Sequence, residues 1–417
     1  MIGWAANPYI KRLNIAFCLI TEKLSELSER LVQNPYVAAI EIPLPGVDDR
    51  RKFIEHTVGP QDGKTLNSFT PEGLAQTSSG LNLVNLNVVL SQAGTRGMET
   101  SQFRKLKKSM IERQCQGLVE FIEPSHTLEL VVGQNAAKGR LKQDAEWLTQ
   151  GRLEMAPMGY LFCGSVGTGK TFLAECCAGS IGIPCVKLRN FRSKYVGETE
   201  GNLEQVLNVL RSLGPVVVII DEADASLGDR QASGDSGTSG RVFSMIAQQM
   251  GDTRYRGRII WMLLTCRPDL LPIDLKRQGR CEVHIPLFAP QDAGEIAEMF
   301  RMMAKKNKAQ LAADALPEIS AERQLSGADL ESILLTARRK ALAAGREVVE
   351  KPDLQAAAEE FIPSSEGLEK EMQEIAAVLE CTERSFLPPD WQKRIAEPDA
   401  RSKLQERMMA IRQLIED

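Results

Sequence analysis

Histidine is scarce in this sequence, and its cysteines are not paired in motifs. The histidines are His56, His126 and His284, and the nine cysteines form no C-x-x-C pair. No combination of these residues has the spacing of a zinc site. The adjacent Cys176 and Cys177 cannot easily bridge each other and are expected to be small buried residues. We therefore expect a reduced, intracellular chain.

Long hydrophobic runs are also missing. The longest, such as Val216–Ile220 and Ile259–Leu264, are far shorter than the roughly 20 residues that cross a bilayer. The opening stretch MIGWAANPYIKRLN has two basic residues but no apolar run of signal-peptide length after them. These absences predict a cytoplasmic protein without a membrane partner.

Neither sign of charge is in large excess. The 417 residues include 51 Lys+Arg and 55 Asp+Glu, a formal net charge of −4, and 43% of them are hydrophobic. This composition excludes collagen-like, wholly disordered and small disulfide-stapled proteins. It also lacks a strongly basic footprint, so nucleic acid is not the expected partner. The basic run Arg104–Lys108 is expected to be a solvated helix face.

A phosphate-binding motif begins after a short apolar run. Residues 160–171 read YLFCGSVGTGKT, which matches G-x-x-x-x-G-K-[ST] between a predicted strand and a predicted helix. Glycines let the loop curl so that its N–H groups face a phosphate chain. Lys170 is expected to reach the β and γ phosphates and Thr171 to bind Mg²⁺. A tight turn without a ligand is the alternative. The predicted cofactor-binding residues here are Gly164, Ser165, Val166, Gly167, Thr168, Gly169, Lys170, Thr171 and Phe172.

A second motif follows about fifty residues later. Residues 215–224 read PVVVIIDEAD, a β-branched run typical of a strand that is buried on both faces of a parallel sheet. Acids at the carboxyl end of such a strand face the ligand crevice. Asp221 is predicted to hold the Mg²⁺ shell, and Glu222 to orient or deprotonate the attacking water. The alternative is that these acids only cap the next helix.

Together the two motifs resemble those of the AAA+ ATPases, in particular the group with a second region of homology. The segment KYVGE, residues 194–198, resembles the family's first pore loop, which grips a threaded chain. The resemblance assigns this role to Tyr195, Val196 and Gly197, although Tyr195 could also be an ordinary half-buried aromatic residue. Residues 233–244, SGDSGTSGRVFS, resemble the family's loop rich in glycine and serine and the helix after it.

Three further segments carry the resemblance. TCRPD, residues 265–269, and KRQGR, residues 276–280, resemble the segment that supplies arginine fingers to a neighbouring subunit. Arg277 and Arg280 match the two fingers, unless both are solvated surface charges. Fingers that act in trans imply a homo-oligomer, and the resemblance implies the hexameric ring of the family. SGADL, with Gly327 and Ala328, resembles the start of the lid over the base and ribose, and Gly133 is expected near the adenine.

The finger segment departs from the family pattern at two positions. Cys266 stands where the family usually has an asparagine that orients the water, and Gln278 stands where proline is common. A thiol is a poor substitute for an amide. Either Thr265 or another residue supplies the missing hydrogen bond, or hydrolysis is slow. Because Cys266 stands at this position, we include it among the predicted catalytic residues, with Glu222, Arg277 and Arg280.

The chain also contains an internal repeat. IAFCLIT at 15–21 and the later Pro43 parallel IWMLLT at 260–265 and the later Pro286, and SGLNL at 79–83 parallels SGADL at 326–330. The first hundred residues therefore resemble the later half of an AAA module. Its finger positions fall at Asn34 and Val37, so this copy has neither arginine. Either Met1 lies inside a longer gene product, which we favour, or the module has degenerated.

These observations predict an α/β fold. We expect a P-loop AAA+ core with a parallel sheet flanked by helices, an α-helical lid, and an N-terminal partial AAA-like module, degenerate or truncated. The expected boundaries are 1–118 for that module and linker, 119–290 for the core, 291–363 for the lid and 364–417 for a helical tail. Strands are expected near 160–163, 184–188, 216–221, 259–265 and 282–285. The closest family pattern is that of Ycf46-like AAA proteins.

Three functions were compared. The first is an Mg²⁺-dependent ATPase that forms a ring and remodels an unknown protein client. The second is an ATP-dependent switch or scaffold with slow hydrolysis, which Cys266 favours. The third, a nucleic-acid motor, is disfavoured by the acidic charge balance. The expected cofactors are ATP and Mg²⁺.

Overall fold

The computed structural model describes residues 7–13, 15, 17–21, 27–35, 37–40, 42–58, 70–96, 100–124, 126–189, 196–228, 238–363 and 367–416. The chain divides into two compact units. The first comprises residues 1–121, 188–216 and 233–249, and the second comprises residues 122–187, 217–232 and 250–417. No helix within these ranges is long and apolar enough to cross a membrane.

The first unit consists mainly of helices. They are α2 (Pro8–Arg12), α3 (Glu29–Val32), α4 (Val47–Val58), α5 (Pro71–Thr77), α6 (Leu83–Arg96), α7 (Thr100–Gln114), α10 (Val196–Ser212) and α12 (Thr238–Met250), the last of which ends one residue beyond the unit. Arg50 of α4 is buried and donates from Nε to the Ala75 carbonyl at 2.9 Å. Lys107 of α7 donates to the Thr77 carbonyl at 2.7 Å. Burial, followed by the nearby charge of Arg50, lowers the pKa of Lys107 to about 8. These polar contacts hold α4, α5 and α7 together.

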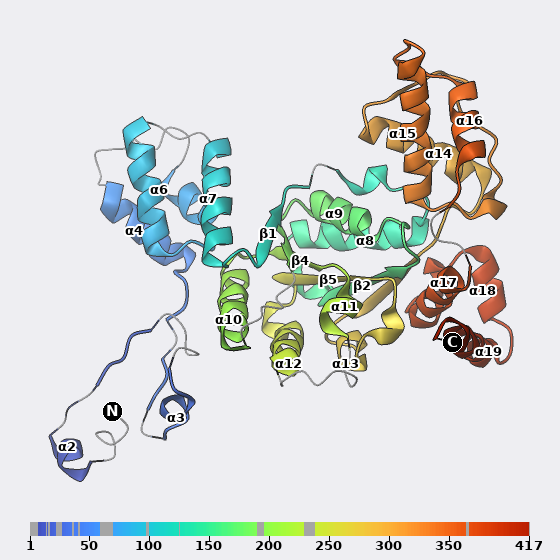
Figure 1. Cartoon of the computed structure of the whole chain (residues 1–417). Coiled ribbons are helices and arrows are strands. Elements are labelled where there is room, and N and C mark those ends of the chain that lie inside the picture. Colours follow the sequence, from blue (N-terminus) through green and yellow to red (C-terminus); the bar gives the residue numbers. More distant parts are fainter. Residues whose placement is uncertain are drawn as a thin grey trace. The chain divides into compact units, whose positions relative to one another are not determined.

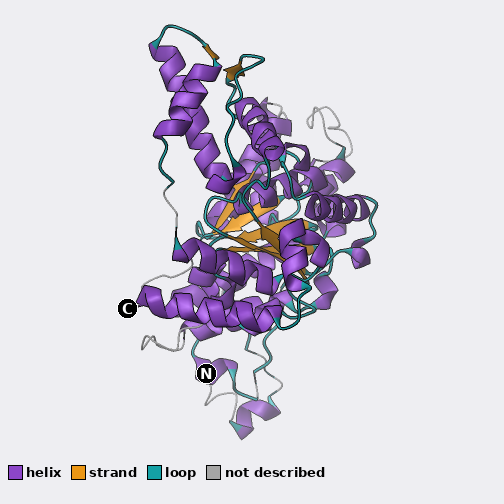
Figure 2. Ribbon diagram, turned by 90° about the vertical axis from the view of Figure 1, so that its right-hand side faces the viewer, coloured by secondary structure: helices purple, strands orange, loops and turns teal. Residues whose placement is uncertain are grey.

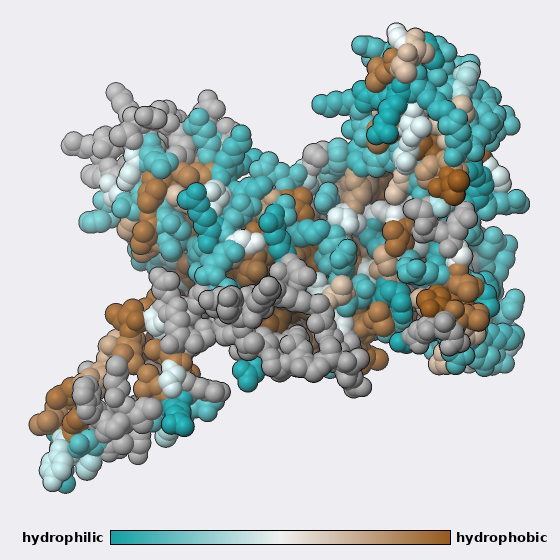
Figure 3. Space-filling view, in the orientation of Figure 1, coloured by the Kyte–Doolittle hydropathy of each residue, from teal (hydrophilic) through white to brown (hydrophobic). Residues whose placement is uncertain are grey.

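The apolar residues before α4 are exposed. Segments 17–20 and 37–40 are assigned neither helix nor strand. Ile20, Ile40 and Ile42 are 93%, 85% and 88% exposed, and Figure 3 shows brown apolar surface along this part of the chain. In the internal repeat, these residues correspond to residues of the second module that form buried strands. A sequence suited to a sheet therefore lies on the surface here.

The second unit is built on a parallel sheet (Figure 1). The strands of the sheet are β1 (Val119–Ile122), β2 (Gly159–Gly164), β3 (Cys185–Leu188), β4 (Val216–Ile220), β5 (Ile259–Thr265) and β6 (Val283–Leu287), in the order β1-β3-β4-β5-β2-β6. Most of β1 is counted with the first unit. β2 pairs with β5 from Gly159 opposite Trp261, and with β6 from Tyr160 opposite Val283. The five strands expected from the apolar runs are thus confirmed, with ends that shift by one or two residues.

Helices cover both faces of this sheet, as the purple helices around the orange strands in Figure 2 show. On one face lie α8 (Asn135–Thr149) and α9 (Lys170–Ile181), which share a core with Tyr160 and Phe162 of β2. Residues alternate along a strand, so Cys163 points to the opposite face. There its thiol lies 3.9 Å from the Ala377 carbonyl of a C-terminal helix. Strands β2, β4, β5 and β6 are therefore fully buried. Short helices lie in the connections between the longer elements: η2 (Leu128–Leu130), η3 (Leu153–Met155), α11 (Ala223–Leu227), η4 (Thr253–Tyr255), η5 (Pro268–Leu270) and α13 (Ile273–Lys276).

The lid follows the last strand. It contains α14 (Ala293–Lys306), η6 (Ala321–Arg323), α15 (Gly327–Ala343) and α16 (Lys351–Glu360), packed around Phe300, Leu330, Ile333 and Leu354. The sequence predicted only helices here. The structure adds a short parallel ladder between β7 (Gln310–Leu311) and β8 (Val348–Val349), because these two-residue strands are too short to produce a periodic pattern.

The C-terminal residues pack on the sheet of their own unit. They form α17 (Leu368–Glu380), η7 (Arg384–Phe386), α18 (Pro389–Ile395) and α19 (Ala400–Glu416). Met372, Ile375 and Val378 of α17 share an apolar cluster with Phe288, which follows β6, and with Leu404 of α19. The sequence left open whether this tail packs on a neighbour or stays mobile. Its first helix is instead part of the layer beside β2 and β6.

Candidate nucleotide site

The loop after β2 curls as the glycine spacing predicts. Gly164 has φ 147° and lies so close to β6 that a Cβ would be 2.2 Å from the Leu287 carbonyl oxygen. Gly167 has φ 81°, in the left-handed region that favours glycine. Side chains at these two positions would therefore open the loop or strain it. The Ser165 hydroxyl is buried and has no hydrogen-bond partner among the described residues, which is the state of a polar group that awaits a ligand.

Lys170 begins helix α9 directly after the loop. Its ammonium donates to the carbonyls of Gly164 and Ser165, both at 2.9 Å. The positive charge of Lys170 therefore lies against the phosphate loop. The first turn of α9 faces the same loop. Backbone N–H groups, a helix N-terminus and a lysine together form a site for a phosphate chain.

Two predicted metal ligands meet at the ends of different elements. The Thr171 hydroxyl lies 3.3 Å from Oδ2 of Asp221, which follows β4. A hydroxyl and a carboxylate are hard oxygen donors, so the residues present fit Mg²⁺. Lys187 of β3 donates to the same carboxylate oxygen at 2.7 Å. Lys187 could not be singled out from the sequence, because a lone lysine in a strand carries no motif.

Glu222 follows Asp221 in a conformation that is unusual for a residue with a side chain. It has φ 48° and ψ 49°, precedes α11, and is exposed. Non-glycine residues in this region are strained and tend to occur at functional sites. The Glu222 N–H donates to Oδ1 of Asp221 at 3.0 Å. Glu222 is therefore an exposed residue directly after Asp221, at the carboxyl end of β4.

The end of β5 lies next to these acids. The buried Thr265 hydroxyl donates to Oδ1 of Asp224 at 2.6 Å and accepts the N–H of Arg267 at 2.9 Å. Its single proton is thus committed to Asp224. Cys266 follows it and is partly exposed. Arg267 forms a bidentate pair with Asp269, at 3.0 and 2.8 Å.

The lid reaches the phosphate loop. Ser326 caps α15 through a capping box with Asp329. The Ala328 N–H donates to the Gly167 carbonyl at 3.2 Å, and Gly327 begins the helix beside it. Across the loop the ring of Phe172 lies 5.2 Å from the Lys306 ammonium of the lid. The structure therefore brings these lid residues, the loop and Phe172 together.

Two other predicted positions lie at the edges of the site. Gly133 has φ 66°, and a Cβ there would be 3.0 Å from Oε1 of Glu295 in the lid helix α14.

Arg277 is 60% exposed and pairs with Asp274 at 3.5 Å. Arg280 is 14% exposed and donates to the Asp274 carbonyl at 2.6 Å. Burial, with the charge of Arg277, lowers the pKa of Arg280. Arg277 is therefore the more accessible of the two arginines.

Comparison with known proteins agrees with this arrangement. Residues 160–288 match the family model "ATPase family associated with various cellular activities (AAA)". Two models of AAA+ chaperones match upstream, the N-terminal Rossmann-like domain at 2–43 and the second helical domain at 48–116. The three matches together cover more than half of the chain. The chain belongs to the AAA+ superfamily.

Three curated AAA+ relatives show how far the similarity extends. The ATP-dependent zinc metalloprotease FtsH of Thermus thermophilus is 28% identical over 368 residues, 81% of this chain and 57% of that protein. The Cell division cycle protein 48 homolog of Archaeoglobus fulgidus is 26% identical, over 76% of this chain and 46% of that protein. Protein SAV of Sulfolobus acidocaldarius is 31% identical, over 45% of this chain and 24% of that protein.

The chain spans about half the length of the first two of these relatives, at 57% and 46%. Their names therefore describe longer proteins. The closer resemblance to Ycf46-like proteins stays a prediction.

One predicted element of the AAA+ site is outside the described residues. The structure does not describe Tyr195, and it describes the backbone of Val196 and Gly197, at the start of α10, but not their side chains. The first part of the loop rich in glycine and serine, at 233–237, is also outside the described ranges. The roles of these residues in gripping a chain stay predictions.

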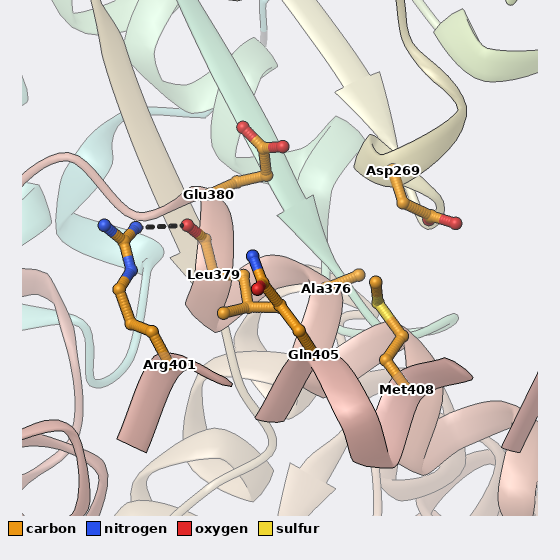
Figure 4. Close-up of a pocket in the computed structure, with 7 residues that line it drawn as sticks. All are labelled: Asp269, Ala376, Leu379, Glu380, Arg401, Gln405 and Met408. Carbon is orange, nitrogen blue, oxygen red and sulfur yellow. Dashed lines mark hydrogen bonds between the residues drawn. The ribbon is translucent and has the colours of Figure 1, made fainter. Parts of the chain in front are cut away.

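Sequence reasoning missed the contribution of the C-terminal tail to the AAA+ site. Gln373 of α17 accepts the N–H of Val166, in the phosphate loop, at 3.1 Å. The same helix also lines an open cavity of about 330 Å³ (Figure 4). It is lined by Asp269, Ala376, Leu379, Glu380, Arg401, Gln405 and Met408. Lys276, the residue before Arg277, is paired with Glu380 at 2.5 Å. α17 thus contacts both the phosphate loop and the finger segment.

Proposed function

We propose that the chain binds and hydrolyses ATP as part of an oligomer, and that hydrolysis drives the remodelling of a protein client. The observation that carries this proposal is the convergence of Lys170, Thr171, Asp221 and Glu222. These residues follow two strands of one parallel sheet, where ligands of α/β proteins bind. They are the set that positions a phosphate chain and a water for phosphoryl transfer.

The residues would divide the work as follows. Mg²⁺ held by Thr171 and Asp221 supplies charge neutralisation on the β and γ phosphates when it is bound. Lys170 exchanges the loop carbonyls for phosphate oxygens. Glu222 orients a water whose oxygen attacks the γ phosphorus while the bond to the β–γ bridging oxygen breaks. Arg277, exposed on its own subunit, would neutralise charge on the γ phosphate of a neighbour.

The proposed domain division keeps the predicted boundaries. Residues 1–118 would be a partial AAA-like module with its linker, followed by the core at 119–290, the lid at 291–363 and the tail at 364–417. The matches to AAA+ chaperone models at 2–43 and 48–116 support a module of this kind at the N-terminus. They also favour a protein client over nucleic acid.

A specific observation favours a second candidate, an ATP-dependent switch or scaffold. Thr265 already donates its proton to Asp224, so it does not replace the missing amide at Cys266. Weaker orientation of the attacking water would slow hydrolysis without affecting binding. In that case assembly in the ATP state would be the output.

The experiment that separates these functions is steady-state ATP turnover per protomer with Mg²⁺ over a wide range of protein concentration. A rate that rises with concentration supports an active ring with fingers in trans. A low, flat rate with intact ATP binding supports the switch. Lys170→Ala should abolish binding in both cases, because it removes the cation of the phosphate site. Unchanged ATP affinity in that variant would contradict the site itself.

A further inference from the structure

The phosphate loop is held by a residue far away in the sequence. Gln373 is 207 residues from Val166, yet its side-chain oxygen accepts the Val166 N–H at 3.1 Å. Gln373 is 5% exposed, which is unusual for a glutamine. A buried amide is retained where it has a partner. Here the partner is the backbone of the loop.

The helix that carries Gln373, α17, is held in place by contacts near its start and at its end. Met372 and Ile375, on either side of Gln373, belong to the apolar cluster with Phe288. At the far end of α17 the ring of His284 in β6 lies 2.9 Å from the Glu380 carbonyl. The Thr382 hydroxyl accepts the His284 N–H at 2.9 Å. The side chain of Gln373 is therefore placed by a rigid element and does not have to be ordered when it bonds to the loop.

The contact falls at the part of the loop that has fewest other restraints. The side chain of Val166 is exposed, whereas Gly164 packs against β6 and Gly167 contacts the lid. The N–H groups that follow Val166 are those expected to face the phosphates. A bond to Val166 holds the loop open without using any of them.

We propose that Gln373 is a positioning residue for the phosphate loop, which α17 uses to keep the loop in the shape that accepts a phosphate chain. The inference rests on the proposed nucleotide function of the loop. It adds a contribution from the C-terminal helix, which no motif of the site includes. Its effect should be confined to ligands that carry phosphates.

The test compares Gln373→Met with the wild-type full chain. Methionine keeps the length and volume of the side chain but cannot accept the bond. Binding of fluorescent ATP and ADP is measured directly, and binding of adenosine by competition. One lost hydrogen bond predicts about two- to tenfold weaker binding of both nucleotides, with adenosine binding unchanged. Gln405→Met, in α19 of the same tail, is the matched control and should bind all three ligands like the wild type.

The outcomes separate this inference from the proposed function. If the wild type binds ATP and folded Gln373→Met binds it equally well, the inference is wrong and the function stands. Equal losses for nucleotides and adenosine would indicate a general structural effect and also overturn it. Hydrogen exchange of the wild type without nucleotide gives a test that needs no variant. The Val166 amide should be protected, and exchange at the rate of a free amide would contradict the proposal.

Discussion

In the proposed mechanism, two neighbouring residues at the end of β5 determine how the attacking water is held. Thr265 is buried, and its hydroxyl joins Asp224 to the backbone of Arg267. Cys266, the next residue, offers a thiol, which is a weak hydrogen-bond donor. In the proposed site, binding and hydrolysis thus depend on different residues, because Lys170 and Thr171 lie at the start of helix α9. Turnover can therefore change here without a change in affinity.

Cys266→Asn tests this at the residue scale. The amide restores a good donor directly after β5, so kcat should rise about two- to tenfold, the effect of one added hydrogen bond. ATP affinity should stay the same. The measurement is steady-state turnover at saturating ATP, with affinity measured separately. Cys266→Ala is the control and should not exceed the wild type. If Cys266→Asn binds ATP normally but has a lower kcat than the wild type, the thiol does not limit hydrolysis.

At the scale of elements, the lid is stabilised by an ion pair at the first turn of helix α16, in which the carboxylate is buried and the guanidinium is partly exposed. Arg346 donates to both carboxylate oxygens of Asp353, each at 2.8 Å, and Asp353 also accepts the Glu350 N–H at 3.0 Å. The hydrogen bonds from Arg346 lower the pKa of Asp353 below its ordinary 3.8. The charged carboxylate is therefore favoured in the folded lid.

This pair predicts a pH-dependent stability. The folded-state pKa is depressed, so its contribution is complete above about pH 4 and is lost as the pH falls through the folded value. Asp353→Asn should lower the free energy of unfolding by about 1.5–3 kcal/mol at pH 7, and the difference should shrink below about pH 4. Urea unfolding of the two proteins at several pH values measures it. Glu360→Gln, in the exposed pair with Lys340, should cost about 0–1 kcal/mol. A difference for Asp353→Asn that does not depend on pH would contradict the assignment.

The elements also show which parts of the site can be predicted from the sequence. The strand before Asp221 was predictable because a β-branched run ending in acids is a local pattern. Thr171 and Asp221 could be paired because parallel strands end at one edge of a sheet. Gln373 could not be found in this way, since glutamine has no preferred role and its partner is a backbone N–H. Contacts made by tertiary packing of a helix leave no periodic signal of their own.

At the scale of the whole molecule, the two units raise different questions. The first carries the matches to AAA+ chaperone domains and the exposed Ile20 and Ile42. The second carries the proposed nucleotide site and Arg277, whose side chain is 60% exposed. In the proposed mechanism this guanidinium serves the site of another copy. Assembly is therefore the condition on which the proposed catalytic cycle depends.

Mixing two inactive variants tests assembly directly. Lys170→Ala removes the phosphate site but keeps the arginine, and Arg277→Ala does the reverse, so each should be inactive alone. In a head-to-tail ring every site combines the loop of one subunit with the arginine of the next. Random mixing in equal amounts places two intact halves together at about one quarter of the interfaces, so turnover should recover to about a quarter of the wild-type rate. Arg254→Ala, at another exposed arginine, should keep full activity. A mixture that stays inactive, although each variant co-assembles with the wild type, would show that Arg277 does not act in trans.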